Sequence, residues 1–128
     1  MESFILEAIV PAPTHKVFKV LTTGTDYAEV TGCEAEIQPW TQGIIAVWNG
    51  YGQGIIIEIE EPSYIKHTWR TSDYQPQMRD SEIEILVNPW GKKTKLTIKA
   101  INIPDNLLQE EKTNWQRFLL EPLVQYFL

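Results

Sequence analysis

Cysteine is nearly absent from this sequence of 128 residues: Cys33 stands alone, so the chain cannot form a disulfide within itself. The two histidines, His15 and His67, lie far apart in the sequence. No Cys/His cluster has the spacing of a metal site, and no glycine-rich phosphate loop is present. We therefore expect neither a metal site nor a bound cofactor.

Long apolar runs and a surplus of positive charge are missing too. No run approaches the ~18 apolar residues that suggest a membrane span. The opening segment MESFILEAIV lacks the basic start of a secretion signal. Eleven basic against seventeen acidic residues give a net charge of −6, which disfavours nucleic-acid binding despite the local patch of Lys92, Lys93 and Lys95. The sequence thus favours a cytoplasmic protein that binds neither membranes nor nucleic acid.

What is present is the composition of a globular domain. Hydrophobic residues make up 43% of the chain and charged residues 22%, as in soluble proteins. The length suffices for one core but is short for two domains of ordinary size. With no internal repeat or linker in sight, we expect residues 1–128 to form one domain.

The first thirty residues predict a strand followed by two short helices. Apolar side chains alternate through residues 3–10, and Pro11 and Pro13 end this strand. Thr14 is suited to cap a helix that runs to Leu21. A second helical piece is expected over residues 26–31. The apolar side of the first helix consists of Val17, Phe18, Val20 and Leu21.

Alternating runs and turn signals fill residues 33–101 and predict an antiparallel meander. The turn signals are Asn49-Gly50, Glu61-Pro62 and Asn88-Pro89-Trp90-Gly91. Between them, one face of each predicted strand is apolar. These faces are formed by Ile44, Ala46 and Trp48; Ile55, Ile57 and Ile59; Ile65, His67 and Trp69; Ile83, Ile85 and Val87; and Leu96, Ile98 and Ala100.

The end of the chain predicts a long helix. Asn106 and Gln109 fit a capping box at its start, and Pro122 should bend it. One apolar stripe at helical spacing, expected to lie on the sheet, consists of Trp115, Phe118, Leu119, Pro122 and Tyr126. A second stripe consists of Leu120, Val124 and Phe127. Either the N-terminal helices cover this second stripe or it joins two copies of the chain, so a monomer and a homodimer both stay open.

Three segments resemble a known superfamily. The stretches VPAPTHKVFKVLT and EIEEPSYIKHTWR resemble the START and birch-pollen-allergen (Bet v 1-like) superfamily. The C-terminal stretch IPDNLLQEEKTNWQRFLLEPLVQYF is similar to the last helix of the activators of heat-shock protein 90 ATPase, particularly around Trp115, Gln116 and Arg117. The resemblance implies an α+β helix-grip fold: a curved antiparallel sheet wrapped around a long C-terminal helix, with two short helices after the first strand.

The resemblance also implies a binding function. Its occupant would be a small apolar molecule held between sheet and helix, or a protein partner such as the chaperone. Phe118 and Leu119 cannot both point straight at the sheet, so one of them should lie nearer the rim. His67, on an inward face, either orients a ligand or is a hydrogen-bonded core residue. The predicted lining of the ligand cavity is Ile57, His67, Trp69, Ile85, Ile98, Trp115, Phe118 and Leu119.

Some members of the superfamily are enzymes that use polar groups inside the cavity, so the resemblance also makes a cavity enzyme an alternative. Tyr64, His67, Arg70 and Asp73 are the residues that such an enzyme would use, but no catalytic signature accompanies them. Cys33 has no identifiable base and is expected to be inert. We therefore predict no catalytic residue. The expected function is non-catalytic binding of a small hydrophobic ligand, with a co-chaperone-like module and a cavity enzyme as alternatives.

Overall fold

A seven-stranded antiparallel sheet organises the computed structural model, which describes all 128 residues. The strand order is β1-β7-β6-β5-β4-β3-β2. Six strands thus follow one another as the predicted meander, and the first strand closes against the last. Their bounds are β1 Glu2–Val10, β2 Glu36–Ile37, β3 Ile44–Val47, β4 Gly52–Glu60, β5 Tyr64–Thr71, β6 Ser81–Trp90 and β7 Lys93–Ile103.

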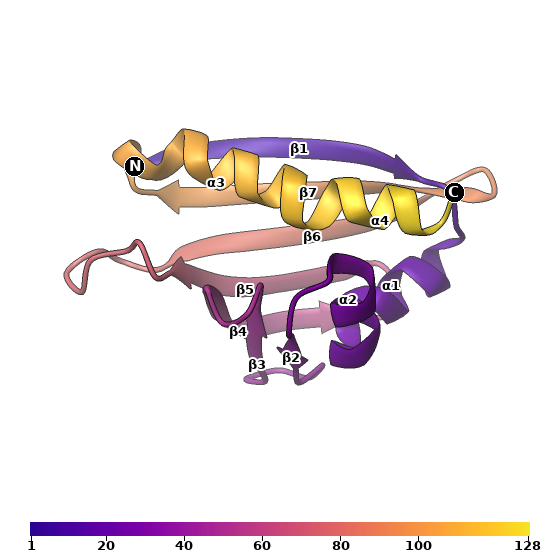
Figure 1. The fold of residues 1–128 in the computed structure, drawn as a ribbon, viewed down its shortest axis with the longest axis horizontal. Coiled ribbons are helices and arrows are strands. Elements are labelled where there is room, and N and C mark those ends of the chain that lie inside the picture. The colour runs from indigo at the N-terminus through magenta and orange to yellow at the C-terminus, as the bar shows by residue number, and fades with distance from the viewer.

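The helices lie on the inner face of this sheet. Two short ones, α1 (Thr14–Thr22) and α2 (Gly24–Thr31), follow β1. The chain ends in a continuous helical stretch made of η1 (Asp105–Leu107), α3 (Leu108–Trp115), η2 (Gln116–Leu120) and α4 (Glu121–Tyr126). Figure 1 shows this stretch running lengthwise along β1, β7 and β6, with α1 and α2 grouped near the end of the sheet at which β1 finishes.

The N-terminal elements agree with the prediction. Phe4 and Val10 of β1 are buried, and the four apolar residues of α1 are all buried. Only the cap differs: Pro13 precedes the helix and no side chain caps it, whereas Thr14 was expected to do so. Because Pro is favourable where no backbone donor is needed, the two prolines still mark the strand end and the helix start.

The prediction that Ile57 of β4 lines the cavity is wrong. The alternation predicts Ile57 on the inner face, but its side chain is 42% exposed while that of Ile56 is 2% exposed. Ile55 is 50% exposed as well, so the inward phase of this part of β4 is that of Gly52 and Ile56. A β-bulge follows at Ile57, because Ile56 pairs with His67 whereas Glu58 pairs with Lys66, and it brings Ile59 opposite the buried Ile65. Ile57 therefore lies outside the space between sheet and helix.

Strand β3 is also out of phase with the prediction. Ile45 and Val47 are buried, while Ile44 is 47% exposed. Because the run from Ile44 to Trp48 is apolar throughout, both phases of the alternation fit it equally well. The later turn differs as well, since β6 continues to Trp90, paired with Lys93, and leaves a shorter connection than expected.

The C-terminal helix begins and packs differently from the prediction. A 3₁₀ turn precedes α3 and no side-chain cap is present, so the expected capping box of Asn106 and Gln109 does not form. Phe118 is 41% exposed and Tyr126 46% exposed. Trp115 and Leu119 of the predicted stripe are buried, as expected, and Leu120 and Leu123 are buried with them.

A π-helical turn accounts for this change of stripe. In η2 the Glu121 N–H bonds to the carbonyl of Gln116, five residues back, so the turn holds one more residue than an α-turn. The turn lies immediately before Pro122, whose ring would clash with the Phe118 carbonyl in a regular helix. The distortion predicted at Pro122 is therefore present as a wide turn.

The second predicted stripe is covered within the same chain. Leu120 is fully buried, and Val124 and Phe127 are half-buried against the core. Helix α4 packs on α2 and on β1. Of the two alternatives, this is cover within one chain, so the burial of the stripe requires no second copy.

These elements form the α+β helix-grip fold that the resemblance implies, with a long C-terminal helix gripped by an antiparallel sheet. The core between sheet and helices contains 25 buried hydrophobic residues. No helix in the structure has the length and apolar character needed to traverse a membrane.

Candidate functional site

Three tryptophans occupy the centre of the space between sheet and helix. Trp48 follows β3, Trp69 lies on β5 and Trp115 ends α3. Their ring centroids are 4.8 to 5.2 Å apart, within the range of favourable aromatic packing. Gly52 permits this arrangement, because a Cβ atom there would collide with the ring of Trp69. We call Trp48, Trp69 and Trp115 the tryptophan cluster.

His67 lies beside the tryptophan cluster and is 1% exposed. Its ring centroid is 5.8 Å from that of Trp69 and 6.4 Å from that of Trp115. The Nδ1–H donates to the carbonyl of Thr68 at 2.6 Å. Burial lowers the pKa of His67 to about 4, because a charged imidazole loses its hydration there. His67 is thus a neutral, hydrogen-bonded core residue at physiological pH.

The tryptophan cluster leaves very little free volume inside. The interior cavity, bounded by His67, Trp69, Ile85 and Trp115 among others, measures about 20 Å³. A single water needs roughly 10–15 Å³ on this measure, and small-molecule sites usually occupy roughly 300–1,000 Å³. The interior is therefore a packed core with space for a water molecule.

Glu111 is the least expected member of this core. It lies on α3, is 1% exposed, and accepts a hydrogen bond of 2.9 Å from the indole Nε1–H of Trp69. Burial raises its pKa to about 7, and the negative charges of Glu110 and Asp73 act in the same direction. The Trp69 N–H opposes this shift, because it stabilises the charged form. A carboxyl group with this pKa changes its charge near neutral pH.

A larger cavity opens at the edge of the space between helix and sheet. It measures about 400 Å³ and lies between the turn before β4, the loop after β5 and the helix stretch α3–η2. We call it the Trp48–Phe118 groove. Its principal lining residues are Trp48, Tyr51, Asp73, Glu110, Asn114 and Phe118.

The aromatic wall of this groove continues the tryptophan cluster outward. The ring centroid of Trp48 is 5.5 Å from that of Phe118 and 6.5 Å from that of Tyr51. Trp48 and Asn49 have φ angles of 55° and 61°, and a positive φ is rare for a residue as bulky as tryptophan. This conformation places the Trp48 ring against both the buried cluster and the exposed groove, so it marks the groove as a candidate site.

Polar contacts connect the elements that surround the groove. The Tyr51 hydroxyl donates to Asp73 Oδ2 at 2.6 Å, and Asn114 Nδ2 donates to the Tyr51 hydroxyl at 3.3 Å. Burial and the neighbouring Asp73 raise the pKa of Tyr51 to about 12, which keeps the hydroxyl protonated. Helix α3 and two loops are thereby joined across one side of the groove.

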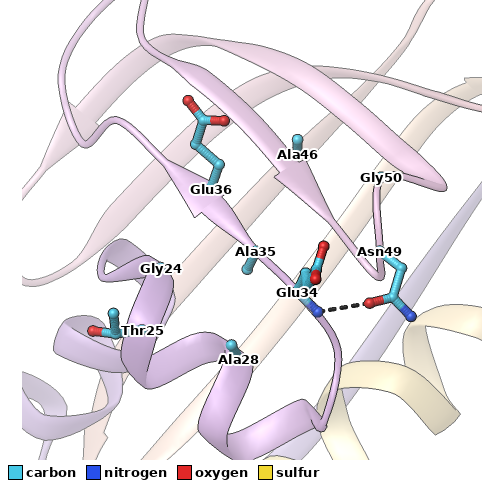
Figure 2. A pocket seen from close by; sticks show the side chains of 9 residues that line it. All are labelled: Gly24, Thr25, Ala28, Glu34, Ala35, Glu36, Ala46, Asn49 and Gly50. Carbon is cyan, nitrogen blue, oxygen red and sulfur yellow. Dashed lines mark hydrogen bonds between the residues drawn. The ribbon is translucent and has the colours of Figure 1, made fainter.

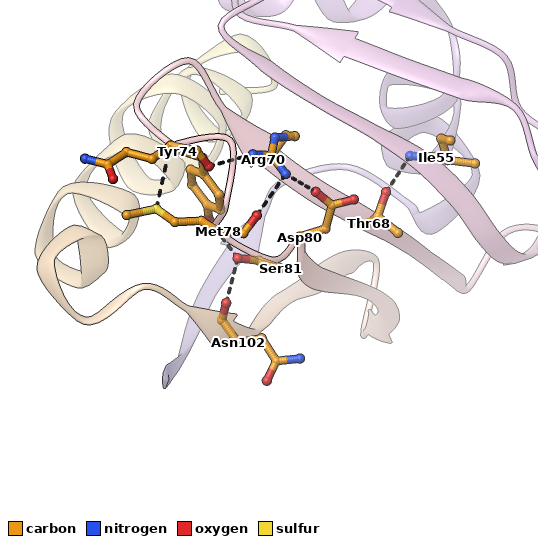
Figure 3. Close-up of polar contacts among 9 residues, drawn as sticks. Ile55, Thr68, Arg70, Tyr74, Met78, Asp80, Ser81 and Asn102 are labelled. Atoms are coloured by element: carbon orange, nitrogen blue, oxygen red, sulfur yellow. Dashed lines mark hydrogen bonds and ion pairs between the residues drawn. The ribbon is translucent and has the colours of Figure 1, made fainter.

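The loop that carries Asp73 is anchored to the sheet by several polar contacts. Arg70 pairs with Asp80 and also donates to the carbonyls of Gln75 and Met78. The Tyr74 hydroxyl is 2.7 Å from Ser81 Oγ, which in turn donates to the carbonyl of Asn102. Figure 3 shows these contacts converging on the loop from β5, β6 and β7. The position of Asp73 therefore depends on a well-anchored segment.

A second surface pocket, of about 520 Å³, lies between α2 and the β2–β3 pair. Figure 2 shows its lining, with the Asn49 side chain accepting a hydrogen bond from the Glu34 N–H. No aromatic side chain lines it, and its apolar residues are three alanines. The Trp48–Phe118 groove is smaller but has the aromatic lining typical of binding sites, so we regard the groove as the candidate site.

The four polar residues considered for catalysis do not meet. On β5 the side chains of Tyr64 and Arg70 lie on the outer face, where they contact Glu84 and Asp80. His67 points into the core, and Asp73 lies at the groove. Alternation along one strand explains this separation. No group of three His, Cys, Asp or Glu residues is placed to hold a metal ion, and Cys33 is a half-buried free thiol beside the groove.

The residues predicted to line the cavity lie in three places: the buried core, the rim of the space between sheet and helix, and the outer face of the sheet. His67, Trp69, Ile85, Ile98, Trp115 and Leu119 are buried. Phe118 is the one nearer the rim, as expected for one member of the pair with Leu119, and Ile57 lies outside. Sequence reasoning missed Glu111, although its position four residues before Trp115 placed it on the same helix face. It also missed Tyr51, Glu110 and Asn114, for which the sequence carries no comparable signal.

Known structures share the fold of this protein. An HSP90 activator from Plasmodium falciparum is 23% identical with a TM-score of 0.83, over 93% of this chain and 91% of that one. CalU16 from Micromonospora echinospora is 22% identical with a TM-score of 0.82, over 98% and 75%. Ara h 8.0201 is 19% identical with a TM-score of 0.74, over 98% and 97%. These identities establish the common fold.

No curated protein matches the sequence. The family model described as "Activator of Hsp90 ATPase homolog 1-like protein" matches residues 11–127. The matched segment includes α1, the tryptophan cluster, every principal residue of the groove and nearly all of the C-terminal helix. The protein belongs to this family of activator of Hsp90 ATPase homolog 1-like proteins.

Proposed function

We propose that the protein is a non-catalytic binding module whose ligand inserts an apolar group into the Trp48–Phe118 groove. Its family and fold support a module that binds a ligand or acts like an HSP90 activator. One contrast supports the groove as the place of binding: it measures about 400 Å³, whereas the interior cavity measures about 20 Å³. The ligand would therefore lie at the edge of the space between sheet and helix.

The lining of the groove suits a small hydrophobic ligand with a polar end. Phe118, which is 41% exposed, offers most of the apolar ring surface, because the adjoining Trp48 is only 4% exposed. Covering that surface is favourable by roughly 25 cal/mol per Å² of apolar area removed from water. Asn114 and Asp73, which also line the groove, supply hydrogen-bonding groups that would orient the ligand.

A neutral probe tests this proposal. Titration of 4-phenyl-1-butanol into ¹⁵N-labelled protein should shift the side-chain N–H signals of Trp48 and Asn114. The backbone amide signals of buried core residues such as Ile85 and Ile98 should stay unchanged. Phe118→Ala should abolish the response, because it removes the exposed half of the aromatic wall. The matched control is Tyr126→Ala, since Tyr126 is a comparably exposed aromatic residue of the same helix outside the groove. Shifts centred on Ile85 and Ile98 would instead show entry into the core, against the proposal.

A co-chaperone-like contact is the second candidate. The family membership and the similar HSP90 activator favour it, and a filled interior makes a surface, rather than a cavity, the place of contact. Binding to purified heat-shock protein 90 and its ATPase rate would test this directly. A bound complex that survives Phe118→Ala would assign the contact to another face of the protein, and absence of binding at high micromolar concentration would reject this candidate.

A further inference from the structure

The Trp48–Phe118 groove carries negative charge without any compensating positive group. Asp73 and Glu110 line it, and no lysine, arginine or histidine does. The five ion pairs of the structure lie elsewhere and involve neither carboxylate. Two unpaired carboxylates beside a low-dielectric aromatic wall produce a focused negative potential.

One of these carboxylates is held in a fixed position. Asp73 accepts the Tyr51 hydroxyl at Oδ2, and its backbone N–H donates to Thr71 Oγ1 at 3.2 Å. The second oxygen, Oδ1, forms no hydrogen bond or ion pair with the protein. A ligand that binds here would therefore meet an oriented acceptor that needs no rearrangement.

The aromatic wall favours the same kind of ligand as the carboxylates. The faces of tryptophan, tyrosine and phenylalanine rings attract cations. The Trp48 and Tyr51 rings are nearly parallel, at 25° and 6.5 Å, and the Phe118 ring is tilted by 54° to Trp48 at 5.5 Å. Ring surface and carboxylate thus border one cavity of about 400 Å³.

We propose that the Trp48–Phe118 groove selects a small organic cation, an alkylammonium or guanidinium group joined to an apolar body, over a neutral or anionic molecule of the same shape. This inference rests on the proposed function, because it assigns a ligand class to the same groove. The volume supports a small molecule as occupant, since it lies within the usual range of small-molecule sites.

Three probes with a common body test the selectivity. Calorimetric titration with 4-phenylbutylammonium, 4-phenyl-1-butanol and 4-phenylbutyrate compares a positive, a neutral and a negative end group. We expect the ammonium probe to bind about tenfold more tightly than the alcohol and the butyrate to bind more weakly than both. The ammonium preference should decrease as salt rises, because partly exposed charges are screened.

Charge-removing variants connect the preference to the groove. The double variant Asp73→Asn/Glu110→Gln keeps the shape of the lining and should reduce the ammonium and alcohol affinities to near equality. The matched control, Glu61→Gln/Glu121→Gln, removes two exposed carboxylates outside the groove and should keep the preference. Thermal melts of both double variants establish that each remains folded.

The outcomes separate this inference from the proposed function. Equal binding of all three probes, lost in Phe118→Ala, would overturn cation selectivity and leave the groove as an apolar site. No binding of any probe would overturn both. A capped arginyl peptide that binds more tightly than 4-phenylbutylammonium would overturn the small molecule as occupant and assign the cation to a protein partner.

Discussion

Trp69 and Glu111, 42 positions apart in the sequence, are joined by a buried hydrogen bond of 2.9 Å. It connects β5 to α3 at the tryptophan cluster, between the packed core and the groove. Because the acceptor is a carboxyl group whose pKa burial raises to about 7, the contact between sheet and helix contains a group that titrates near neutral pH. The first prediction concerns its protonation.

The stability of the protein should fall between about pH 4.5 and pH 7 because of Glu111. Its pKa is higher in the folded protein, at about 7, than the ordinary value of 4.5. The folded state therefore holds a proton that the unfolded chain releases, so this contribution is complete below pH 4.5 and lost as pH rises through 7. The test is urea unfolding of wild type and Glu111→Gln at pH 5 and at pH 8. The decrease in the free energy of unfolding from pH 5 to pH 8 should be smaller in the variant by on the order of 2 kcal/mol.

The control for this experiment is Glu110→Gln, which changes the adjacent exposed carboxylate on the same helix. It should keep most of the wild-type pH dependence. If both variants flatten the pH profile equally, the effect arises from the general charge of the helix, and the burial of Glu111 does not explain it.

Truncation of the tryptophan cluster should be severe. Trp115→Ala removes a 2% exposed ring that packs on both other members of the cluster, so the free energy of unfolding should fall by about 4 kcal/mol. Trp90→Ala is the matched control, since Trp90 is 54% exposed and its ring lies 5.2 Å from the Lys95 ammonium, outside the tryptophan cluster. Its cost should stay below about 1 kcal/mol. Equal losses in chemical denaturation would contradict the central role of the cluster.

Loss of Arg70 should free the loop that carries Asp73. Arg70→Met removes the pair with Asp80 and two donations to loop carbonyls. Hydrogen exchange at residues 73–78 should accelerate, while global stability falls by about 1–2 kcal/mol, because the pair is only partly buried. Lys66→Met, which removes a single ion pair with Glu82, should leave exchange in this loop unchanged. Equal exchange in the two variants would show that other contacts hold the loop.

Val124→Glu should destabilise the protein without altering its mass in solution. The side chain is half-buried on the core where α4 meets α2, so an added carboxylate would be partly desolvated. We expect a loss of about 1–3 kcal/mol in unfolding experiments, with sedimentation unchanged. Gln125→Glu, at the exposed neighbouring position, should be neutral. A wild-type dimer that Val124→Glu converts to a stable monomer would contradict this prediction and make the second stripe an interface.

Local patterns predicted most of the fold because polar and apolar residues alternate clearly in β1, β5, β6 and β7. They failed in β3, where every residue is apolar, and in β4, where the consecutive Ile55, Ile56 and Ile57 fit either phase and the bulge depends on pairing with β5. The site was less predictable. The number of tryptophans suggested an aromatic interior, but only packing decides whether rings line a cavity or fill it.

The groove could not be predicted from the sequence for a related reason. Tyr51, Asp73 and Asn114 belong to a turn, a loop and a helix that are distant in the chain. Their approach depends on where the hairpin turns end relative to the helix, which sequence spacing does not encode. Glu111, which lies in the core and not in the groove, did carry a signal, since it is four residues before Trp115 on the same helix face.

The wide turn at η2 also determines which changes of length the C-terminal helix tolerates. Each residue of a helix rotates its successor by about 100°. The π-turn already accommodates one extra residue, so deleting one residue within Gln116–Leu120 would restore a regular helix and keep Leu123 in the core, although Pro122 would then lie within an unbroken hydrogen-bond ladder. Inserting one more residue in this segment has no wider turn to absorb it, so it would rotate Leu123 and everything beyond it by about 100°.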